Sequence, residues 1–287
     1  MNFFDALKEQ KYLIFDGAMG TILQTKGLAP GIAPEEWNLE NSEAIYQVHK
    51  SYVDSGVDII ETNTFGGNTI KLAMHGLGDK LYEVNYQGAQ IAKKASMGKA
   101  YVAGNIGPSG KLIKPLGDVS EEELYDAFKS QALALATGGV DLFNVETMSC
   151  LTEAKIALQA IKENTNLPVI AMMSFESGRK TMMGIGPAVA VQELEALGVD
   201  VIGANCGLGP KEMLPIIEEM LKIASVPVMA QPNAGLPKLV GTKTVFDQTP
   251  VAFANYAKEF LELGVKIFGG CCGTTPAHMA AVVKLVK

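Results

Sequence analysis

Two adjacent cysteines near the C-terminus, in the stretch "FGGCCGTTPAH", are the residues of this 287-residue chain best suited to chemistry. Neighbouring side chains of an extended backbone point to opposite sides, and a disulfide between such neighbours is strained. The glycines that flank Cys271 and Cys272 also make core packing a poor explanation for the pair. We therefore infer that something outside the pair holds both sulfur atoms.

The composition of the chain limits the possible partners. The net charge is −7 and Arg179 is the single arginine, whereas nucleic-acid binding needs clustered cations. The first residues lack the basic start and continuous apolar core of a signal peptide, and no apolar run reaches the ~18–20 residues that span a bilayer. We expect a cytoplasmic protein without nucleic-acid or membrane partners. Its cysteines would stay reduced, as metal ligands or catalytic thiols.

One pattern recurs along the sequence and must position these thiols. Four helical stretches are followed by a glycine and then by a short run of Val, Ile and Phe; the glycines are Gly56, Gly139, Gly198 and Gly264. Glycine ends helices because it adopts a left-handed backbone without steric cost. Short apolar runs with little alternation are typical of strands buried on both faces of a parallel sheet.

Four further candidate strands lie between these repeats, around Ile14, Val102, Ile170 and Val228. Eight strand–helix units in a chain of this length predict an α/β fold, a single (β/α)8 TIM barrel. A doubly wound open sheet is the alternative, but "DGAMGT" after the first strand has too few glycines for a phosphate-binding turn. No linker-like tract divides the chain, so we expect one domain over residues 1–287.

The carboxyl ends of the barrel strands are where chemistry gathers, because the following loops converge there. Cys206 falls at the end of the sixth strand, and Cys271 and Cys272 fall at the end of the eighth. Three converging thiolates favour zinc and leave a fourth coordination position for a substrate. The alternative is that they are small buried residues that pack the barrel mouth. We expect packing or surface roles for the remaining candidate ligands, Cys150, His49, His75 and His278.

Six motifs together resemble the homocysteine S-methyltransferase family: "DGAMGTILQ", "DIIETNTFGGN", "NIGPSG", "GANCGLGP", "QPNAG" and "FGGCCGTTPAHM". They look most like the homocysteine-binding module of cobalamin-dependent methionine synthases, and the match runs from about Tyr12 to the C-terminus. The resemblance implies a (β/α)8 barrel that binds one zinc through three cysteines and methylates the sulfur of homocysteine. The matching positions are Cys206, Cys271 and Cys272.

The resemblance also suggests how the substrate binds. Asp16 and Glu146 would receive the amino group of homocysteine, and backbone N–H groups near Gly17 and Ala18 would hold its carboxylate. Asn233 would occupy the fourth zinc position before the substrate arrives. We expect no catalytic residue beyond the zinc site.

The chain lacks a "DxHxxG" corrinoid-binding motif, so we expect a separate corrinoid protein to present methylcobalamin to the barrel mouth. A small donor is the alternative, either S-methylmethionine or betaine, although betaine needs an aromatic cage and the chain has one tryptophan. A third possibility is a zinc-binding subunit of a larger methyl-transfer complex that acts on another thiol.

Overall fold

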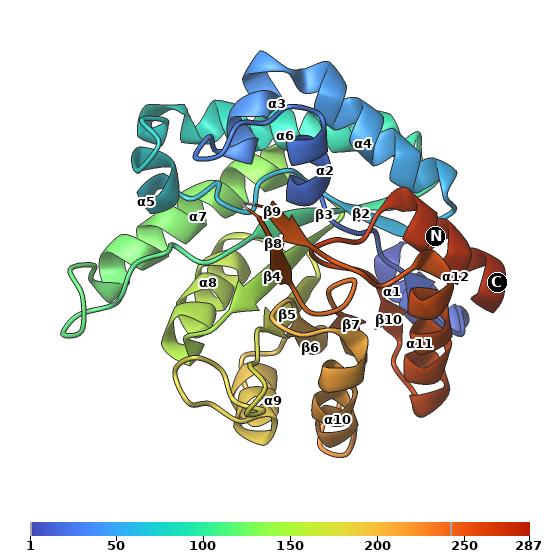
Figure 1. Ribbon diagram of the computed structural model, residues 1–287. Helices are drawn as coiled ribbons and strands as arrows, with labels where there is room; N and C mark the ends of the chain where they lie inside the picture. The colour runs from blue at the N-terminus through green and yellow to red at the C-terminus, as the bar shows by residue number, and fades with distance from the viewer. Residues whose placement is uncertain (1, 242) are drawn as a thin grey trace.

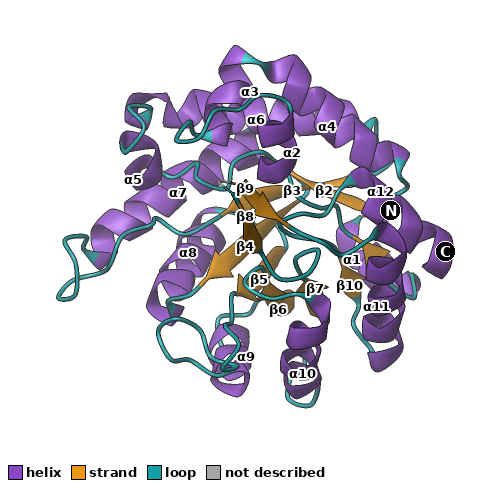
Figure 2. Ribbon diagram, in the orientation of Figure 1, coloured by secondary structure: helices purple, strands orange, loops and turns teal. Residues whose placement is uncertain are grey.

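The computed structural model describes residues 2–241 and 243–287. A barrel of eight parallel strands lies at its centre (Figures 1 and 2). In their order around the barrel, the strands are β1 (Leu13–Ile14), β10 (Ile267–Phe268), β7 (Val228–Gln231), β6 (Val201–Asn205), β5 (Val169–Met173), β4 (Leu142–Met148), β3 (Tyr101–Ile106) and β2 (Ile59–Glu61). A parallel bridge between Phe15 and Ile59 joins the first strand to the last. The predicted (β/α)8 barrel and all eight of its predicted strands are confirmed.

A ring of helices surrounds the barrel, with one helix after each strand (Figure 1). These are α4 (Ser42–Asp54), α6 (Leu81–Ser96), α7 (Glu121–Thr137), α8 (Leu151–Asn164), α9 (Pro187–Glu195), α10 (Pro210–Leu221), α11 (Pro250–Leu263) and α12 (Pro276–Val286). Shorter helical pieces are α1 (Phe3–Glu9), α2 (Gly20–Thr25), η1 (Pro34–Glu36), α3 (Trp37–Glu40), α5 (Thr69–Ala73) and η2 (Gly78–Lys80). Among the described residues, no helix has the length and hydropathy needed to cross a bilayer.

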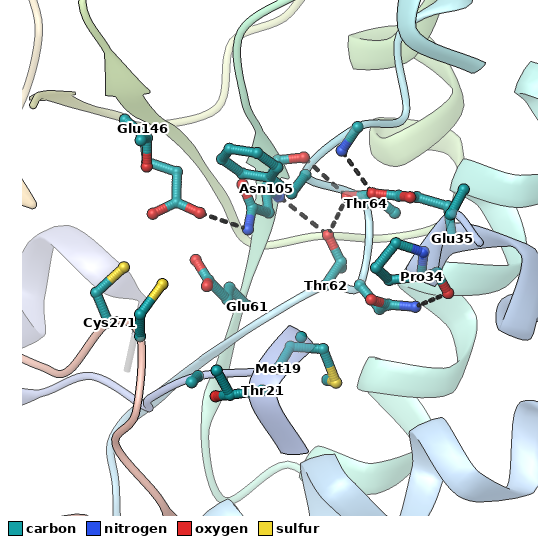
Figure 3. Close-up of a pocket in the computed structure, with 18 of the residues that line it drawn as sticks. Met19, Thr21, Pro34, Glu35, Glu61, Thr62, Thr64, Asn105, Glu146 and Cys271 are labelled. Atoms are coloured by element: carbon teal, nitrogen blue, oxygen red, sulfur yellow. Dashed lines mark hydrogen bonds between the residues drawn. The ribbon is translucent and has the colours of Figure 1, made fainter. Parts of the chain in front are cut away.

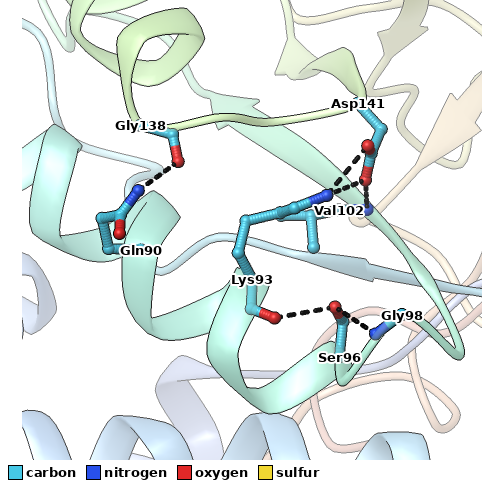
Figure 4. A network of polar contacts seen from close by, with 7 residues as sticks. All are labelled: Gln90, Lys93, Ser96, Gly98, Val102, Gly138 and Asp141. Carbon is cyan, nitrogen blue, oxygen red and sulfur yellow. Dashed lines mark hydrogen bonds and ion pairs between the residues drawn. The ribbon is translucent and has the colours of Figure 1, made fainter.

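The repeated sequence "GVD" before three of the strands has a structural explanation. The repeat glycine adopts a positive φ each time, as expected for a helix end. The aspartate that follows it accepts a hydrogen bond from a backbone N–H of a neighbouring strand. Asp58 accepts from Ile14, Asp141 from Val102 and Asp200 from Val169, at 2.7 to 2.8 Å. Figure 4 shows Asp141, which also pairs with Lys93 of α6 at 2.9 Å.

The barrel interior is divided along its axis into an apolar half and a polar half. The amino-terminal half holds inward-facing apolar residues of every strand, and α1 closes it from below with Phe3, Ala6 and Leu7. Two residues further along several strands, the inward positions become polar: Glu61 follows Ile59, and Gln231 follows Met229. The period of two along a strand therefore places polar side chains inside the barrel at its carboxyl end.

His49 lies on α4 with its side chain fully buried, in agreement with the packing role predicted for it. Neither ring nitrogen has a hydrogen-bond partner among the described residues. Burial disfavours the charged imidazolium, and it lowers the pKa of His49 to about 3. Folding therefore keeps this ring neutral at pH values where the unfolded chain protonates it.

We expect His49 to make the folded protein sensitive to acid. Below about pH 6.5 the unfolded state binds a proton that the native state does not, so stability falls by about 1.4 kcal/mol per pH unit. His49→Leu should remove this dependence. Urea unfolding of the metal-free proteins at about pH 7 and about pH 5 would measure it. Equal losses of stability in the wild type and the variant would contradict the assignment.

A two-stranded antiparallel hairpin was not predicted. It consists of β8 (Lys238–Val240) and β9 (Lys243–Val245) in the loop between β7 and α11, at the carboxyl end of the barrel (Figure 1). Its residues Leu239 and Val240 are 77% and 62% exposed. The strands are short and the side chains of Lys238–Val240, Thr244 and Val245 are exposed, so the sequence contains no alternation from which this hairpin could be inferred.

Candidate metal centre and active site

The three predicted cysteine ligands lie together at the carboxyl end of the barrel. Cys206 directly follows β6, and Cys271 and Cys272 follow β10. Their sulfur atoms all lie within 4.8 Å of one another, and the Sγ atoms of Cys206 and Cys272 are 3.9 Å apart. A tetrahedral zinc site with Zn–S bonds of about 2.3 Å requires sulfur atoms about 3.8 Å apart. The donor set and its spacing therefore fit zinc.

The backbone around the cysteine pair is fixed from two sides. Cys271 N donates to Pro232 O, and Cys272 O accepts from Ala234 N, each at 2.9 Å, so the loop after β7 holds the pair. Gly273 has φ of 80°, and a Cβ atom there would come within 2.3 Å of the ring of Phe246. Glycine at position 273 therefore meets the need for both a left-handed turn and space.

The electrostatics of the thiols favour a cation among them. Hydrogen bonds from Cys271 and Cys272 lower the pKa of Cys206, which becomes the first thiol to ionise. The resulting hydrogen bonding with Cys206 raises the pKa of Cys271 and of Cys272. Without a cation, ionisation of Cys206 is therefore favoured, and ionisation of Cys271 and Cys272 is disfavoured. A divalent metal would favour the ionised forms, because a coordinating thiol is deprotonated.

Two non-glycine residues that line the cavity have left-handed backbones. Cys206 has φ of 57° and Thr147 has φ of 58°. This region is unfavourable for residues with a Cβ, and most of all for a β-branched residue such as threonine. Asn205 holds the second conformation, since its Oδ1 accepts from Thr147 N and its Nδ2 contacts Thr147 Oγ1, both at 2.8 Å. The strain is thus located next to the thiols and next to Glu146.

Three buried carboxyl groups face the same cavity as the cysteines. Asp16 and Glu146, the predicted contacts of the substrate amino group, are 1% and 6% exposed, and Glu61 is 9% exposed. Asp16 Oδ2 accepts from Glu61 N at 3.0 Å, which places Asp16 beside Glu61. Figure 3 shows the carboxyl groups of Glu61 and Glu146 near Cys271. The structure therefore brings the two predicted carboxylates together and adds a third.

Amide side chains from the neighbouring strands hold these carboxyl groups in place. Glu146 accepts from Asn105 at 2.8 Å and from Asn205 at 2.6 Å, one bond to each carboxylate oxygen. Glu61 accepts from Asn144 at 3.2 Å. By contrast, Asp16 Oδ1 is buried and has no hydrogen-bond partner among the described residues. A buried carboxylate oxygen without a donor favours a ligand that brings its own N–H groups.

Burial raises the pKa of all three carboxyl groups. Desolvation is the main cause each time, and it raises the pKa of Glu146 to about 7. Repulsion from Glu146 further raises the pKa of Asp16 and of Glu61. Like charges brought this close cannot all ionise without a cation. An ammonium group between them would restore the ionised forms, so the cluster is suited to binding a primary amine.

Glu61 is the residue of this cluster that the sequence analysis left out of the predicted site. It stands at the carboxyl end of β2, in "ETNTF", and so had the same placement as Asp16 and Glu146. The period of two from Ile59 would have identified it, since Ile59 faces the barrel interior. A polar residue in phase with inward-facing apolar residues is the signal for such positions.

The backbone predicted to hold the substrate carboxylate is only partly available. Ala18 N donates to Thr274 Oγ1 at 3.0 Å, and Ala18 O accepts from Tyr52 at 2.8 Å. Thr274 is fully buried and also donates to Cys271 O at 2.7 Å. The Gly17 amide has no hydrogen-bond partner within the described part of the chain. Of the two predicted amides, Gly17 is therefore the one that is free.

Asn233 lies beside the thiols, as the sequence predicted. Its backbone N–H donates to Leu208 O at 3.0 Å. Hydrogen bonding to its side chain also lowers the pKa of Cys206, after the larger effects of the two cysteines and of the Gly207 backbone. Its Oδ1 is buried without a hydrogen-bond partner among the described residues. An amide oxygen in this position is a suitable additional ligand for a metal ion.

The other candidate ligands lie outside the cysteine cluster. Cys150 is the residue that precedes α8 and lies outside the cysteine cluster. His278 Nδ1 is 2.9 Å from Thr275 Oγ1 at the start of α12, and its Nε2 is 2.9 Å from Gln248 O. His75 lines the same cavity as the cysteines, near Glu35. Only this last residue has access to the site.

The cavity has a volume of about 310 Å³ and runs from the cysteines past the carboxyl cluster (Figure 3). Pro34 and Glu35 lie at its other end, and Phe65 is the aromatic ring among the described lining residues. Glu35 is buried, and its Oε1 accepts from Gly66 N at 2.5 Å. The cysteines therefore lie at one end of the cavity, the carboxyl groups lie next to them, and Pro34 and Glu35 line the other end.

Known proteins are similar to this chain in sequence and in architecture. The chain is 34% identical to the methionine synthase of Mycobacterium tuberculosis (strain H37Rv) and 33% identical to that of Mycobacterium leprae, in each case over 295 aligned positions that cover 96% of the chain. It spans about a quarter of the length of these relatives.

Among solved structures, the metallated form of the homocysteine methyltransferase MmuM from Escherichia coli matches with a TM-score of 0.81 and 23% identity, over 97% of both chains. At this identity the match shows a shared fold. The family model for homocysteine S-methyltransferases matches residues 13–286. The resemblance seen in the sequence motifs is therefore confirmed, and the chain belongs to the homocysteine S-methyltransferase family.

Proposed function

We propose that this chain is a zinc-dependent enzyme that transfers a methyl group to the thiol of homocysteine and so forms methionine. The observation that carries the proposal is the row of groups in one cavity, with three thiols beside three buried carboxyl groups. A substrate with a thiol and an amino group would bring its sulfur to the cysteines and its amine to the carboxyl groups. In this proposal residues 1–287 act as a single homocysteine-binding barrel.

Cys206, Cys271 and Cys272 would hold the metal, with Asn233 as a fourth ligand before the substrate arrives. Bound zinc supplies a thiolate at neutral pH, where a free thiol with a pKa of about 8.5 is mostly protonated. Three thiolates and one Zn²⁺ have a net charge of −1, so the centre withdraws little electron density from an added sulfur. The chain's own part is to fix three sulfur atoms in one geometry.

Asp16, Glu61 and Glu146 would bind the ammonium group of the substrate, which offsets part of their negative charge. The amides that bond to Glu146 and Glu61 fix the directions of these carboxylates. The Gly17 amide is available for the substrate carboxylate. Held at the ammonium and the carboxylate, homocysteine has its sulfur pointed at the cysteines, which limits the attack on a methyl group to one direction.

We propose methylcobalamin, carried by a separate corrinoid protein, as the methyl donor. The support for this donor is the resemblance of the motifs to cobalamin-dependent methionine synthases; both relatives are named methionine synthases and are much longer than this chain. Betaine would require an aromatic cage around its quaternary ammonium group. The described lining contributes one such ring, Phe65, while Phe175 is buried outside the cavity.

Methionine formation by the zinc-loaded protein tests the proposal. Homocysteine is supplied with methylcobalamin, with S-methylmethionine or with betaine in parallel reactions. Methionine from methylcobalamin alone is the expected result. Methionine from a small donor would contradict the corrinoid proposal and retain the thiol methylation. Failure of homocysteine to bind the zinc-loaded protein, measured by calorimetry, would contradict homocysteine as the substrate.

A further inference from the structure

The backbone of Gly17 and Ala18 lies between two buried hydroxyl groups from distant parts of the chain. Tyr52 is on α4 and Thr274 is in the loop after β10, and both side chains are fully buried. Tyr52 Oη donates to Ala18 O at 2.8 Å, and Ala18 N donates to Thr274 Oγ1 at 3.0 Å. Among residues 2–241 and 243–287, no other backbone hydrogen bond joins these two residues to another element. The two hydroxyl groups therefore set the direction of this backbone.

Both hydroxyl groups also lie directly against Gly17. A Cβ atom on this residue would come within 2.5 Å of Thr274 Oγ1 and 3.0 Å of Tyr52 Oη. Ordinary contacts between heavy atoms are about 3.5–4 Å long, so only glycine fits here without a shift of its neighbours. The position of the Gly17 amide consequently depends on where the two hydroxyl groups are held.

The Gly17 amide is the unpaired group at this position. Gly17 is buried and lines the cavity, and its N–H has no hydrogen-bond partner among the described residues. Buried backbone N–H groups without a partner are rare, because they lose their bond to water and gain nothing in return. An acceptor that enters the cavity removes this cost, and a carboxylate is a strong acceptor. The Ala18 amide offers no such place, since it already donates to Thr274.

Thr274 also joins this backbone to the cysteines. Its hydroxyl donates to Cys271 O at 2.7 Å while it accepts from Ala18 N. One hydroxyl can do both, because it has one hydrogen and two lone pairs. In the same region Gly270 N donates to Asp16 O at 2.9 Å. A short series of hydrogen bonds therefore fixes the distance between the free amide and the thiols.

We propose that Tyr52 is a positioning residue for the substrate carboxylate, and that it makes the protein selective for thiols that carry one. This inference rests on the proposed function. Tyr52 is not among the residues that line the cavity, so it acts through Ala18 and not by contact with the substrate. Its hydroxyl holds the Ala18 carbonyl, and the adjoining Gly17 amide is thereby aimed before the substrate arrives. A donor fixed in advance loses less entropy on binding than one that must be ordered.

Two variants and two ligands test this. Tyr52→Phe removes the hydroxyl and keeps the ring. Tyr125→Phe is the matched control, because it removes a hydroxyl that donates to Glu163 Oε2 at 2.7 Å between α7 and α8, away from the cavity. The ligands are homocysteine and 3-aminopropane-1-thiol, which has the same thiol and amino group but no carboxylate. Calorimetry on each zinc-loaded protein gives both dissociation constants, and their ratio is the preference for the carboxylate.

We expect the wild type and Tyr125→Phe to prefer homocysteine by about 10- to 100-fold, as for a hydrogen bond to a charged group. In Tyr52→Phe this preference should fall by about tenfold. The affinity for 3-aminopropane-1-thiol should be the same in all three proteins, because this ligand does not use the Gly17 amide. Their zinc content should also be the same.

The two ligands separate a positioning role from a structural one. An equal loss of affinity for both ligands in Tyr52→Phe would overturn the proposal, and so would an unchanged preference; either result would leave homocysteine as the substrate. Equal affinity of the wild type for the two ligands would overturn it as well, whether or not the variant folds, since no carboxylate site would then exist. Failure of the wild type to bind either ligand would instead contradict the proposed function, and this inference with it.

Discussion

Zinc and methyl transfer are expected to be lost together when Cys272 is replaced by serine. The cluster then has two thiols in place of three, and the hydroxyl of serine is a much weaker ligand for zinc. Without the metal, homocysteine is mostly a neutral thiol near pH 7, so the rate should fall by about a hundredfold or more. Zinc content by atomic absorption and methionine formation would be measured on the same preparation.

Cys150→Ser is the matched control, because Cys150 lies outside the cluster at the start of α8. This variant should keep its zinc and its activity. Full zinc occupancy in Cys272→Ser, or in the corresponding Cys206→Ala protein, would contradict the three-cysteine site. Loss of zinc in the Cys150 variant would equally contradict it, because all four thiols would then be required.

Glu146→Gln should weaken homocysteine binding and leave zinc in place. The substitution keeps the size of the side chain but removes the negative charge that faces the ammonium group. Hydrogen bonds to charged groups contribute about 1.5–3 kcal/mol, which corresponds to a rise in the KM for homocysteine of about 10- to 100-fold. Calorimetric titration with homocysteine and steady-state kinetics would measure the change.

A thiol without an amino group is the control for this prediction. The Glu146→Gln protein and the wild type should bind 3-mercaptopropionate equally, because this ligand has no ammonium group to contact the Glu146 side chain. If the variant bound homocysteine as the wild type does, the amino-group role of Glu146 would be wrong. A loss of zinc in this variant would assign Glu146 to the metal centre.

The fold and the cluster of three cysteines were predictable because both depend on local sequence signals. A glycine after four of the helices and short apolar runs at eight positions define the strands, and the ends of the strands follow from them. Cys206, Cys271 and Cys272 could therefore be placed on one rim. Their convergence followed from the architecture, with no side-chain detail required.

The remainder of the site depends on which way each side chain points. Glu61 was among the polar residues at strand ends, but the sequence alone did not show that its side chain joins Asp16 and Glu146 in the cavity. The bond from Ala18 to Thr274 joins residues 256 positions apart, so no local pattern predicts it. The hairpin β8–β9 belongs to a long loop whose conformation is set by contacts such as that of Phe246 with Gly273.

The polar half of the barrel interior also has a consequence for the protein's evolution and engineering. Buried oxygen atoms of Asp16, Asn105, Asn144 and Gln231 lack hydrogen-bond partners among the described residues, and such atoms are costly to bury. A fold selected for stability alone would replace them with apolar side chains. Their retention is a trade of stability for activity. We therefore expect homocysteine to raise the melting temperature markedly, and directed evolution toward heat resistance to remove these residues first.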